Sequence, residues 1–139
     1  MEIAYLDTSA LVKRYHREEY SDVVDDIFSN YVIAISELTI VEFTSALRKK
    51  VDEKIIEKRE LLLTLSKLHE DLADLVIVKF DSAVVNSAVD FILKYSLKTL
   101  DSLQLSFAIK LKDFNPLFVS FDKKLVKCAK LEGFRVLEI

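Results

Sequence analysis

The chain of 139 residues contains few of the residues on which several specialised folds depend, and each shortage excludes a class of protein. Cys128 is the single cysteine, so an internal disulfide is impossible and a zinc site built from cysteines is unsupported. No stretch approaches the roughly 20 uncharged apolar residues that span a bilayer, and the sequence does not open with a basic segment followed by an apolar run. We therefore predict a soluble, cytoplasmic protein with no membrane attachment.

Glycine and proline each occur once, and no repeat, low-complexity tract or linker divides the chain. Hydrophobic residues make up 51% of the sequence and charged residues 31%, a balance that suits one domain with a sizeable core. The expected organisation is a single domain over residues 1–139. The formal charge of −3 averages over acidic and basic patches, so it neither supports nor excludes a nucleic acid as partner.

Short apolar segments alternate with longer segments of helical periodicity. The short segments are rich in β-branched and aromatic residues, which predicts strands over residues 2–6, 31–35, 75–80, 117–121 and 135–138. Helical spacing predicts helices over residues 21–29, 38–50, 53–73, 82–95, 101–112 and 123–132, and another that begins near Ala10. Gly133 is placed to end the last of these helices. The alternation indicates an α/β fold with a central parallel sheet of about five strands and helices on both faces.

Four acidic residues stand where short apolar segments give way to helices: Asp7, Glu42, Asp101 and Asp122. Open parallel sheets bind their ligands beyond the carboxyl ends of the strands, and Asp7 and Asp122 fall at that edge. If the fold gathers all four residues, they form a dense carboxylate cluster that needs a divalent cation. Hard cations such as Mg²⁺ prefer oxygen ligands, which suits a site made of carboxylates without histidine.

Each acid also has an explanation that involves no metal. Asp7 and Asp122 are well placed to cap the helices that follow them. Asp101 lies two residues after Thr99, itself a good cap, where the helix dipole favours an acid. Glu42 differs because its neighbours on a helix are mostly apolar and form a stripe that faces the core. An ionised carboxylate there needs a cation, an opening to water or a salt bridge to lysine or arginine.

Four blocks of sequence carry a resemblance to a known family. They are YLDTSALVKRY (5–15), ISELTIVEFTSALRKK (35–50), LKTLDSLQLSFAIKL (97–111) and FVSFDKKLVKCAKLEGFRVL (118–137). In this order and at these spacings they resemble the PIN-domain family, and specifically the VapC-type ribonuclease toxins of prokaryotic toxin-antitoxin modules. The resemblance runs nearly from end to end of the chain. It implies a compact three-layer α/β/α domain.

The resemblance also implies the chemistry of the site. The residues that match the family's catalytic and metal-binding positions are Asp7, Glu42, Asp101 and Asp122, which would hold one or two Mg²⁺ or Mn²⁺ ions. Ser9 and Ser120 match its supporting hydroxyls. The implied activity is metal-dependent endonucleolytic hydrolysis of RNA phosphodiester bonds, with 5′-phosphate and 3′-hydroxyl products.

Two positions depart from the family pattern. Gln104 stands three residues after the third acid, where many members have histidine. Lys123 and Lys124 follow the fourth acid, where some members have a further acid. The first departure leaves the four acids intact, and the second puts a fully occupied second metal site in doubt.

An RNA substrate would have to be held beside a negative cluster. Basic residues follow three of the four acids: Lys13, Arg14 and Arg17; Arg48, Lys49 and Lys50; and Lys123, Lys124, Lys127 and Lys130. We expect some of them to contact phosphates, with Lys13, Arg14, Arg17 and Lys123 as the candidates. The alternative is that they form ordinary solvated helix surface. Neither His16 nor His69 has metal-ligand spacing.

Leucines recur at helical spacing between Glu60 and Leu75, at positions 61, 62, 65, 68, 72 and 75. We expect them to belong to the core. Any part of the stripe left exposed would suit an antitoxin helix or a second copy of the chain. The resemblance implies both a cognate antitoxin and a homodimer.

Two other functions remain open. A phosphatase or phosphotransfer domain would also have an aspartate after its first strand, but Ser9 and Leu6 stand where such domains need further acids. A non-enzymatic PIN-like module would bind RNA or a protein without cleaving it. The complete set of four acids argues against this second alternative.

Overall fold

A five-stranded parallel sheet runs through the described residues, 1–138, of this computed structural model. Its strands are β1 (Ile3–Leu6), β2 (Val32–Ser36), β3 (Val76–Val78), β4 (Leu117–Val119) and β5 (Arg135–Val136). They lie in the order β3-β2-β1-β4-β5, and every pairing is parallel. The predicted fold class is therefore confirmed, while residue 139 of the predicted domain lies outside the described residues.

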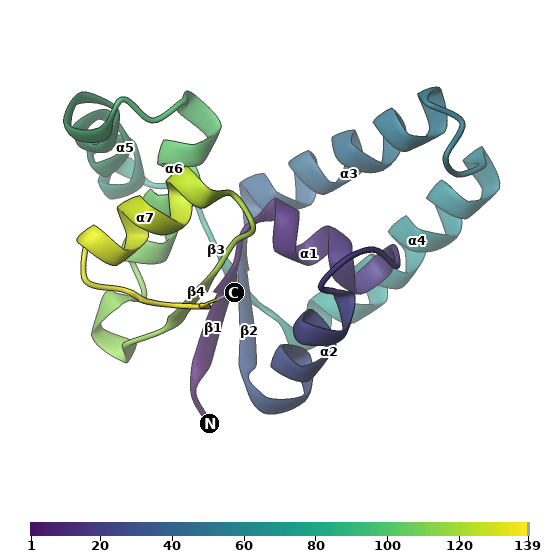
Figure 1. Cartoon of the computed structure of the whole chain (residues 1–139), viewed down its shortest axis with the longest axis horizontal. Helices are drawn as coiled ribbons and strands as arrows, with labels where there is room; N and C mark the ends of the chain where they lie inside the picture. The colour runs from purple at the N-terminus through teal and green to yellow at the C-terminus, as the bar shows by residue number, and fades with distance from the viewer. Residues whose placement is uncertain (139) are drawn as a thin grey trace.

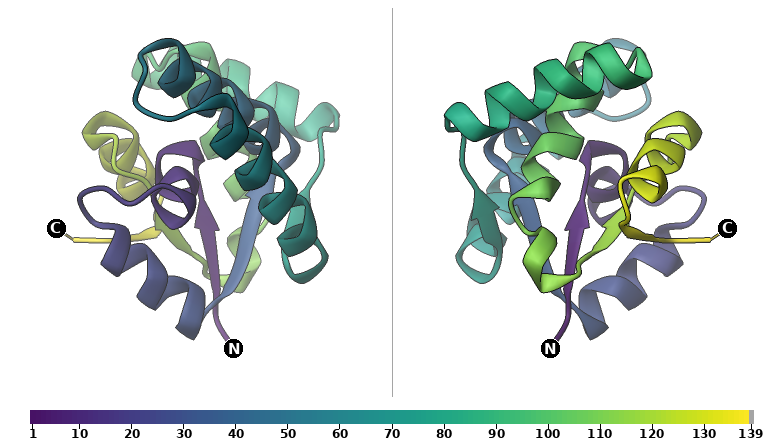
Figure 2. Two further views of the ribbon diagram at one scale, coloured as in Figure 1. Left: turned by 90° about the vertical axis from the view of Figure 1, so that its right-hand side faces the viewer. Right: turned by 90° about the vertical axis from the view of Figure 1, so that its left-hand side faces the viewer.

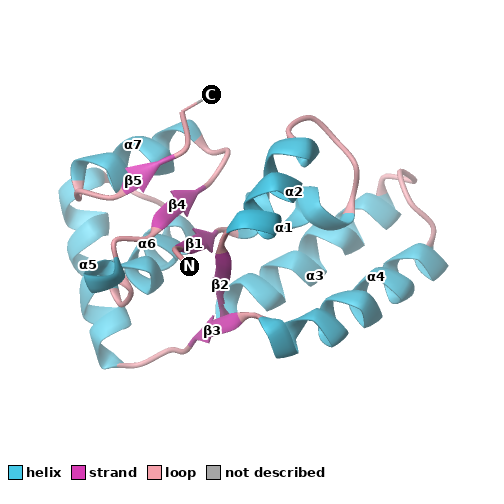
Figure 3. Cartoon of the chain, turned by 90° about the horizontal axis from the view of Figure 1, so that it is seen from below, coloured by secondary structure: helices cyan, strands magenta, loops and turns pink. Residues whose placement is uncertain are grey.

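Helices cover both faces of this sheet. In residues 1–138 they are α1 (Thr8–Tyr15), α2 (Ser21–Asn30), α3 (Glu37–Asp52), α4 (Lys58–Asp71), α5 (Ser82–Tyr95), α6 (Thr99–Ile109) and α7 (Lys123–Leu131). Two short 3₁₀ turns, η1 (Leu72–Asp74) and η2 (Lys112–Phe114), precede β3 and β4. Figure 1 and Figure 3 show α1–α4 on one side of the sheet and α5–α7 on the other, and Figure 2 presents the two sides in turn. None of the helices in residues 1–138 has the length and apolar character needed to cross a membrane.

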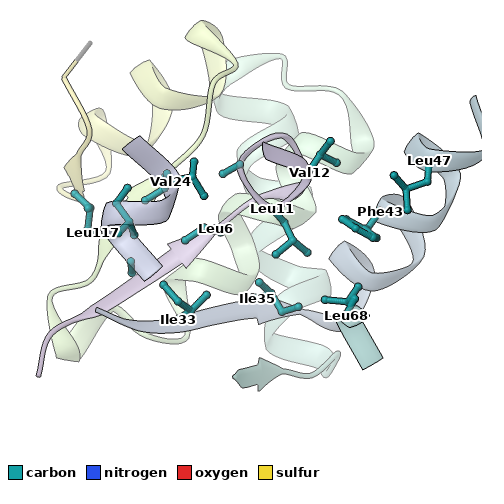
Figure 4. Close-up of a cluster of buried hydrophobic side chains, with 14 of the residues drawn as sticks. Leu6, Leu11, Val12, Val24, Ile33, Ile35, Phe43, Leu47, Leu68 and Leu117 are labelled. Carbon is teal, nitrogen blue, oxygen red and sulfur yellow. The ribbon is translucent and has the colours of Figure 1, made fainter. Parts of the chain in front are cut away.

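Successive residues of the central strands point into two different cores. On β1, Leu6 joins the cluster formed with α1–α4, which includes Leu11 and Phe43 (Figure 4), whereas Tyr5 joins the cluster formed with α5–α7. Phe118 stacks on Tyr5 in the second cluster, with ring centroids 5.7 Å apart. Both faces of a strand are buried in a sheet covered by helices on each side, which explains why the strand sequences are apolar without alternation.

Three details of the predicted helices are wrong. The helix predicted over residues 53–73 begins only at Lys58, because the chain turns after α3 and the N–H of Ile55 donates to the carbonyl of Lys50 at 2.8 Å. The apolar pattern continued through this turn because Ile56 is buried there. Thr99 is the first residue of α6 and not its cap, which is Lys98. On α4, Leu62 is 58% exposed and so lies outside the core.

The end of α7 confirms the role predicted for Gly133. Its φ angle is 89°, its N–H donates to the carbonyl of Lys130 at 3.0 Å, and the N–H of Phe134 donates to that of Ala129 at 3.0 Å. These two bonds make a Schellman motif, in which glycine avoids the steric cost of the left-handed conformation.

The strand order reverses direction at one place, between β1 and β4. From β1 the chain proceeds outward to β2 and β3, and it then returns to place β4 on the other side of β1. Open α/β sheets bind ligands in the crevice beyond the carboxyl ends of the strands at such a switch point. The segments that form this crevice are the β1–α1 and β4–α7 turns.

Candidate active site

Asp7 lies at the centre of this crevice, directly after β1. Its side chain is 5% exposed and accepts three hydrogen bonds: from the N–H of Ala10 at 3.0 Å, from Ser9 Oγ at 2.7 Å and from Ser120 Oγ at 2.6 Å. Asp7 therefore caps α1, as its position predicts, and contacts both of the predicted hydroxyls. Burial raises the pKa of Asp7 to about 6, and the charge of Asp101 adds to this effect.

Asp122 stands at the neighbouring turn between β4 and α7. Its carboxylate is exposed and caps α7 by accepting a hydrogen bond from the N–H of Leu125 at 2.9 Å. Its own N–H donates to Ser120 Oγ at 3.1 Å, so one serine connects this turn to Asp7. A second connection runs from the N–H of Phe121 to Ser9 Oγ at 3.0 Å. The two turns are thus fixed to each other by serine hydroxyls.

Glu42 reaches the site from the second turn of α3. It accepts hydrogen bonds from the Thr8 hydroxyl at 2.9 Å and from the Gln104 amide at 2.8 Å. No lysine or arginine in residues 1–138 forms a salt bridge with it, so that alternative is wrong for the described part of the chain. The predicted core-facing stripe is also wrong, because its neighbour Val41 is 68% exposed and Phe43 is the residue that faces the core.

Gln104 on α6 is a site residue whose position the sequence identified only as a departure from the family pattern. Its side chain is buried, and its Oε1 accepts a hydrogen bond from the Tyr5 hydroxyl at 2.5 Å. Its amide nitrogen lies 3.0 Å from Thr39 Oγ1 and 2.8 Å from Glu42 Oε1. The signal was available in the sequence: an amide one helical turn after Asp101, among apolar residues, shares a face with that acid.

Asp101 completes the acidic set from the first turn of α6, where it is half-buried. Burial raises its pKa, and the negative charges of Asp122 and Glu42 raise it further, while Lys98 and Lys124 act in the opposite direction. The charge of Asp101 in turn raises the pKa of Asp7. The fold therefore brings the four predicted acids close enough to repel one another at a single edge of the sheet.

The donor set suits a hard divalent cation, although the side chains do not enclose one tightly. In residues 1–138, no group of three or more His, Cys, Asp or Glu side chains is arranged to hold a metal ion. Mg²⁺ commonly binds through one or two carboxylates and keeps several waters, so a loose arrangement of oxygen donors matches its needs. None of the four carboxylates forms a salt bridge within the described part of the chain that would neutralise it.

The four basic residues predicted to contact phosphates fall into two groups. Arg14 and Arg17 both pair with Asp25 on α2, at 2.7 and 2.5 Å, and Lys13 pairs with Glu18 at 3.3 Å. Lys123 on α7 has no salt bridge to a carboxylate in residues 1–138. Paired guanidinium groups offer less charge to a phosphate than a free ammonium group does. The α7 side of the site is consequently the more available cationic surface.

Comparisons with known proteins agree with this fold. The family model of the PIN domain matches residues 4–131. No curated protein in the comparison matches the chain. Among solved structures, a toxin-antitoxin complex from Klebsiella pneumoniae is 16% identical, with a TM-score of 0.68 over 97% of this chain and 96% of the other. VapBC2 from Rickettsia felis, bound to a DNA fragment from its promoter, is 20% identical, with a TM-score of 0.66 over 97% of each chain. VapC20 from Mycobacterium tuberculosis, a toxin that cleaves the Sarcin-Ricin loop, is 12% identical, with a TM-score of 0.70 over 99% and 98%.

Proposed function

The chain belongs to the PIN-domain family, and from that premise we propose that it is a divalent-metal-dependent endoribonuclease, the toxin of a type II toxin-antitoxin pair. One observation carries the proposal. Four carboxylates from separate elements lie near one another at the switch point of the sheet, where burial and their mutual charges raise the pKa of Asp7 and Asp101 and no lysine or arginine in residues 1–138 forms a salt bridge with them. Maintaining such repulsion costs stability, and a bound cation would relieve it.

The four acids differ in burial and hydrogen bonding, and we assign their roles accordingly. Asp7 is buried and held by three donors, so its carboxylate would stay in place as Mg²⁺ or Mn²⁺ binds. Asp101 and Glu42 would complete the ligands directly or through water. When bound, the cation supplies positive charge to the phosphate oxygens and activates water for hydrolysis. Asp122 is exposed beside them and would serve as a further ligand or orient the attacking water.

The proposed partners are an RNA substrate, a cognate antitoxin and a second copy of the chain. The RNA substrate follows from the site chemistry together with a similar fold in a toxin described as cleaving the Sarcin-Ricin loop. Similar folds also occur in toxin-antitoxin complexes, which supports a cognate antitoxin as the inhibitor. The exposed leucines 62 and 63 on α4 offer an apolar surface to an antitoxin helix or to the second subunit of a homodimer.

The test is cleavage of a panel of structured RNAs by the purified protein in Mg²⁺ or Mn²⁺. We expect cleavage that EDTA and Asp101→Asn both abolish, since Asn removes the charge that binds the cation. Asp90→Asn is the matched control, because Asp90 is an exposed helix residue outside the acidic set. Equal cleavage by the Asp101→Asn protein would contradict the proposal. A folded protein that binds no metal in calorimetry would favour the non-enzymatic module instead.

A further inference from the structure

A cavity of about 470 Å³ opens beside the acidic residues, between α1, the α1–α2 loop and α7. Its size lies within the range typical of small-molecule sites. Ser120 lines it, and the same hydroxyl donates to Asp7 at 2.6 Å. Phe121, the residue between Ser120 and Asp122, also lines it. The cavity therefore adjoins the candidate active site through Ser120, although none of the four acids lines it.

One wall of the cavity is aromatic. Tyr20 and Phe121 lie nearly parallel, with ring centroids 5.3 Å apart and an angle of 16° between the planes. Tyr20 is 39% exposed although it is a large side chain, and Phe121 is half-buried. The backbone of Phe121 is anchored through its N–H to Ser9. Lys13 Nζ lies 4.8 Å from the centre of the Phe121 ring, so Phe121 is covered by Tyr20 and Lys13, and Tyr20 is the ring of this wall that offers an exposed surface.

The cavity also has a cationic lining. Four lysines and two glutamates line the cavity, and two of the lysines, Lys13 and Lys130, pair with Glu18 and Glu138. Lys123 and Lys127, one helical turn apart on α7, form no salt bridge with any carboxylate of residues 1–138. An anionic group would be complementary to these two ammonium groups.

We propose that the cavity binds one nucleotide of a single-stranded RNA, the one next to the phosphodiester that is cleaved. Its base would stack against Tyr20, which Phe121 supports from behind, and its phosphate would lie against Lys123 and Lys127. Stacking on aromatic side chains and phosphate contacts from lysine are how proteins bind single strands without strict sequence preference. The inference rests on the proposed function, whose substrate is RNA, and it assigns the direction in which that RNA leaves the acidic residues.

The first test measures binding of octauridylate and octaadenylate by fluorescence anisotropy in the Asp101→Asn background, in which the RNA stays intact. Tyr20→Leu keeps apolar volume but removes the stacking surface, so we expect binding to weaken about fivefold or more. Each oligonucleotide is also tested with a single abasic position, moved along the strand. At the position that occupies the cavity, loss of the base should abolish the difference in affinity between the protein with Tyr20 and the Tyr20→Leu variant. An effect of Tyr20→Leu that is the same at every abasic position would overturn the stacking proposal.

The second test measures the salt dependence of the same binding. Lys123→Gln with Lys127→Gln should lower the slope of log affinity against log salt by about 0.7, because the two lysines contact one phosphate and each phosphate neutralised on a single strand contributes about 0.7. Lys54→Gln with Lys58→Gln is the matched control, at the turn between α3 and α4 across the molecule from α7 (Figure 1). This control pair should leave the slope unchanged. An unchanged slope for the α7 pair would overturn the phosphate assignment.

Cleavage assays separate these results from a failure of the proposed function. A wild-type protein that cleaves RNA in Mg²⁺, while the cavity variants bind the oligonucleotides as tightly as their background, would keep the nuclease and overturn the nucleotide cavity. If the wild-type protein cleaves RNA and the cavity variants lose affinity as described, both the nuclease proposal and the nucleotide cavity are supported. If the protein cleaves long RNA but its Asp101→Asn form binds neither octamer, the cavity proposal is also overturned, and a protein partner becomes the better occupant.

Discussion

Replacing Asp7 with asparagine should make the metal-free protein more stable near pH 8, even though the same change should abolish cleavage. Asp7 is buried, and its pKa is raised from the ordinary value of 3.8 to about 6. Since a tenfold change in proton affinity corresponds to about 1.4 kcal/mol, this difference amounts to about 3 kcal/mol of folding free energy. Asparagine removes the charge and accepts weaker hydrogen bonds, which costs about 1 kcal/mol. The expected net gain is about 2 kcal/mol.

The sign of the pH dependence follows from where the proton is bound. Below about pH 4 the Asp7 carboxyl is protonated in both the folded and the unfolded chain. Between about pH 4 and pH 6 the unfolded chain releases this proton while the folded protein keeps it, so the free energy of unfolding falls as the pH rises. Above about pH 6 the folded protein has also released this proton, so the free energy of unfolding falls no further. The advantage of Asp7→Asn over the wild type should therefore be small near pH 4 and full near pH 8.

The assay is urea denaturation in EDTA at several pH values, with the wild type and two variants. Asp81→Asn is the control, because Asp81 also caps a helix, through the N–H of Val84 at 2.9 Å, but its pKa is lowered by its hydrogen bond with Lys110. Its charge stabilises the folded protein above the unfolded pKa, so Asp81→Asn should destabilise near pH 8. If Asp7→Asn is no more stable than the wild type at any pH, the buried charge of Asp7 does not destabilise the folded protein, and the predicted cost of its burial is refuted.

Three further predictions concern the site and its scaffold. Gln104→Leu should lower the free energy of unfolding in urea by about 1–3 kcal/mol, because the buried Tyr5 hydroxyl and the Glu42 carboxylate lose the amide that pairs with them; unchanged stability would mean that these bonds contribute nothing. Mg²⁺ should raise the Tm of the wild type more than that of Glu42→Gln, since a ligand of the folded state stabilises in proportion to its affinity; equal shifts would remove Glu42 from the ligand set. Gly133→Ala should lower the free energy of unfolding by about 1–2 kcal/mol, because φ is 89° there and a Cβ would lie 2.9 Å from Lys112 Nζ; a Tm equal to that of the wild type would contradict this estimate.

The α/β architecture and the positions of the four acids were predictable from local sequence. Short apolar runs and helical spacings are local properties, and in a sheet covered on both faces they agree with burial, as Tyr5 and Leu6 show by facing opposite cores. The capping roles of Asp7 and Asp122 were predictable for the same reason, because a cap binds an N–H only three residues away. Capping and a place in the site turned out to be compatible, since each carboxylate has two oxygens.

Contacts between distant residues decided the rest. The bond from Gln104 to Glu42 spans 62 positions and that from Ser120 to Asp7 spans 113, so no local pattern encodes them. The pairing of Arg14 with Asp25 likewise depends on how α1 packs against α2. Sequence alone thus determined which residues are the candidates for the chemistry and which element each one follows. Only the tertiary structure decided which of their charges are compensated and where a cavity adjoins them, because both depend on the packing of elements far apart in the chain.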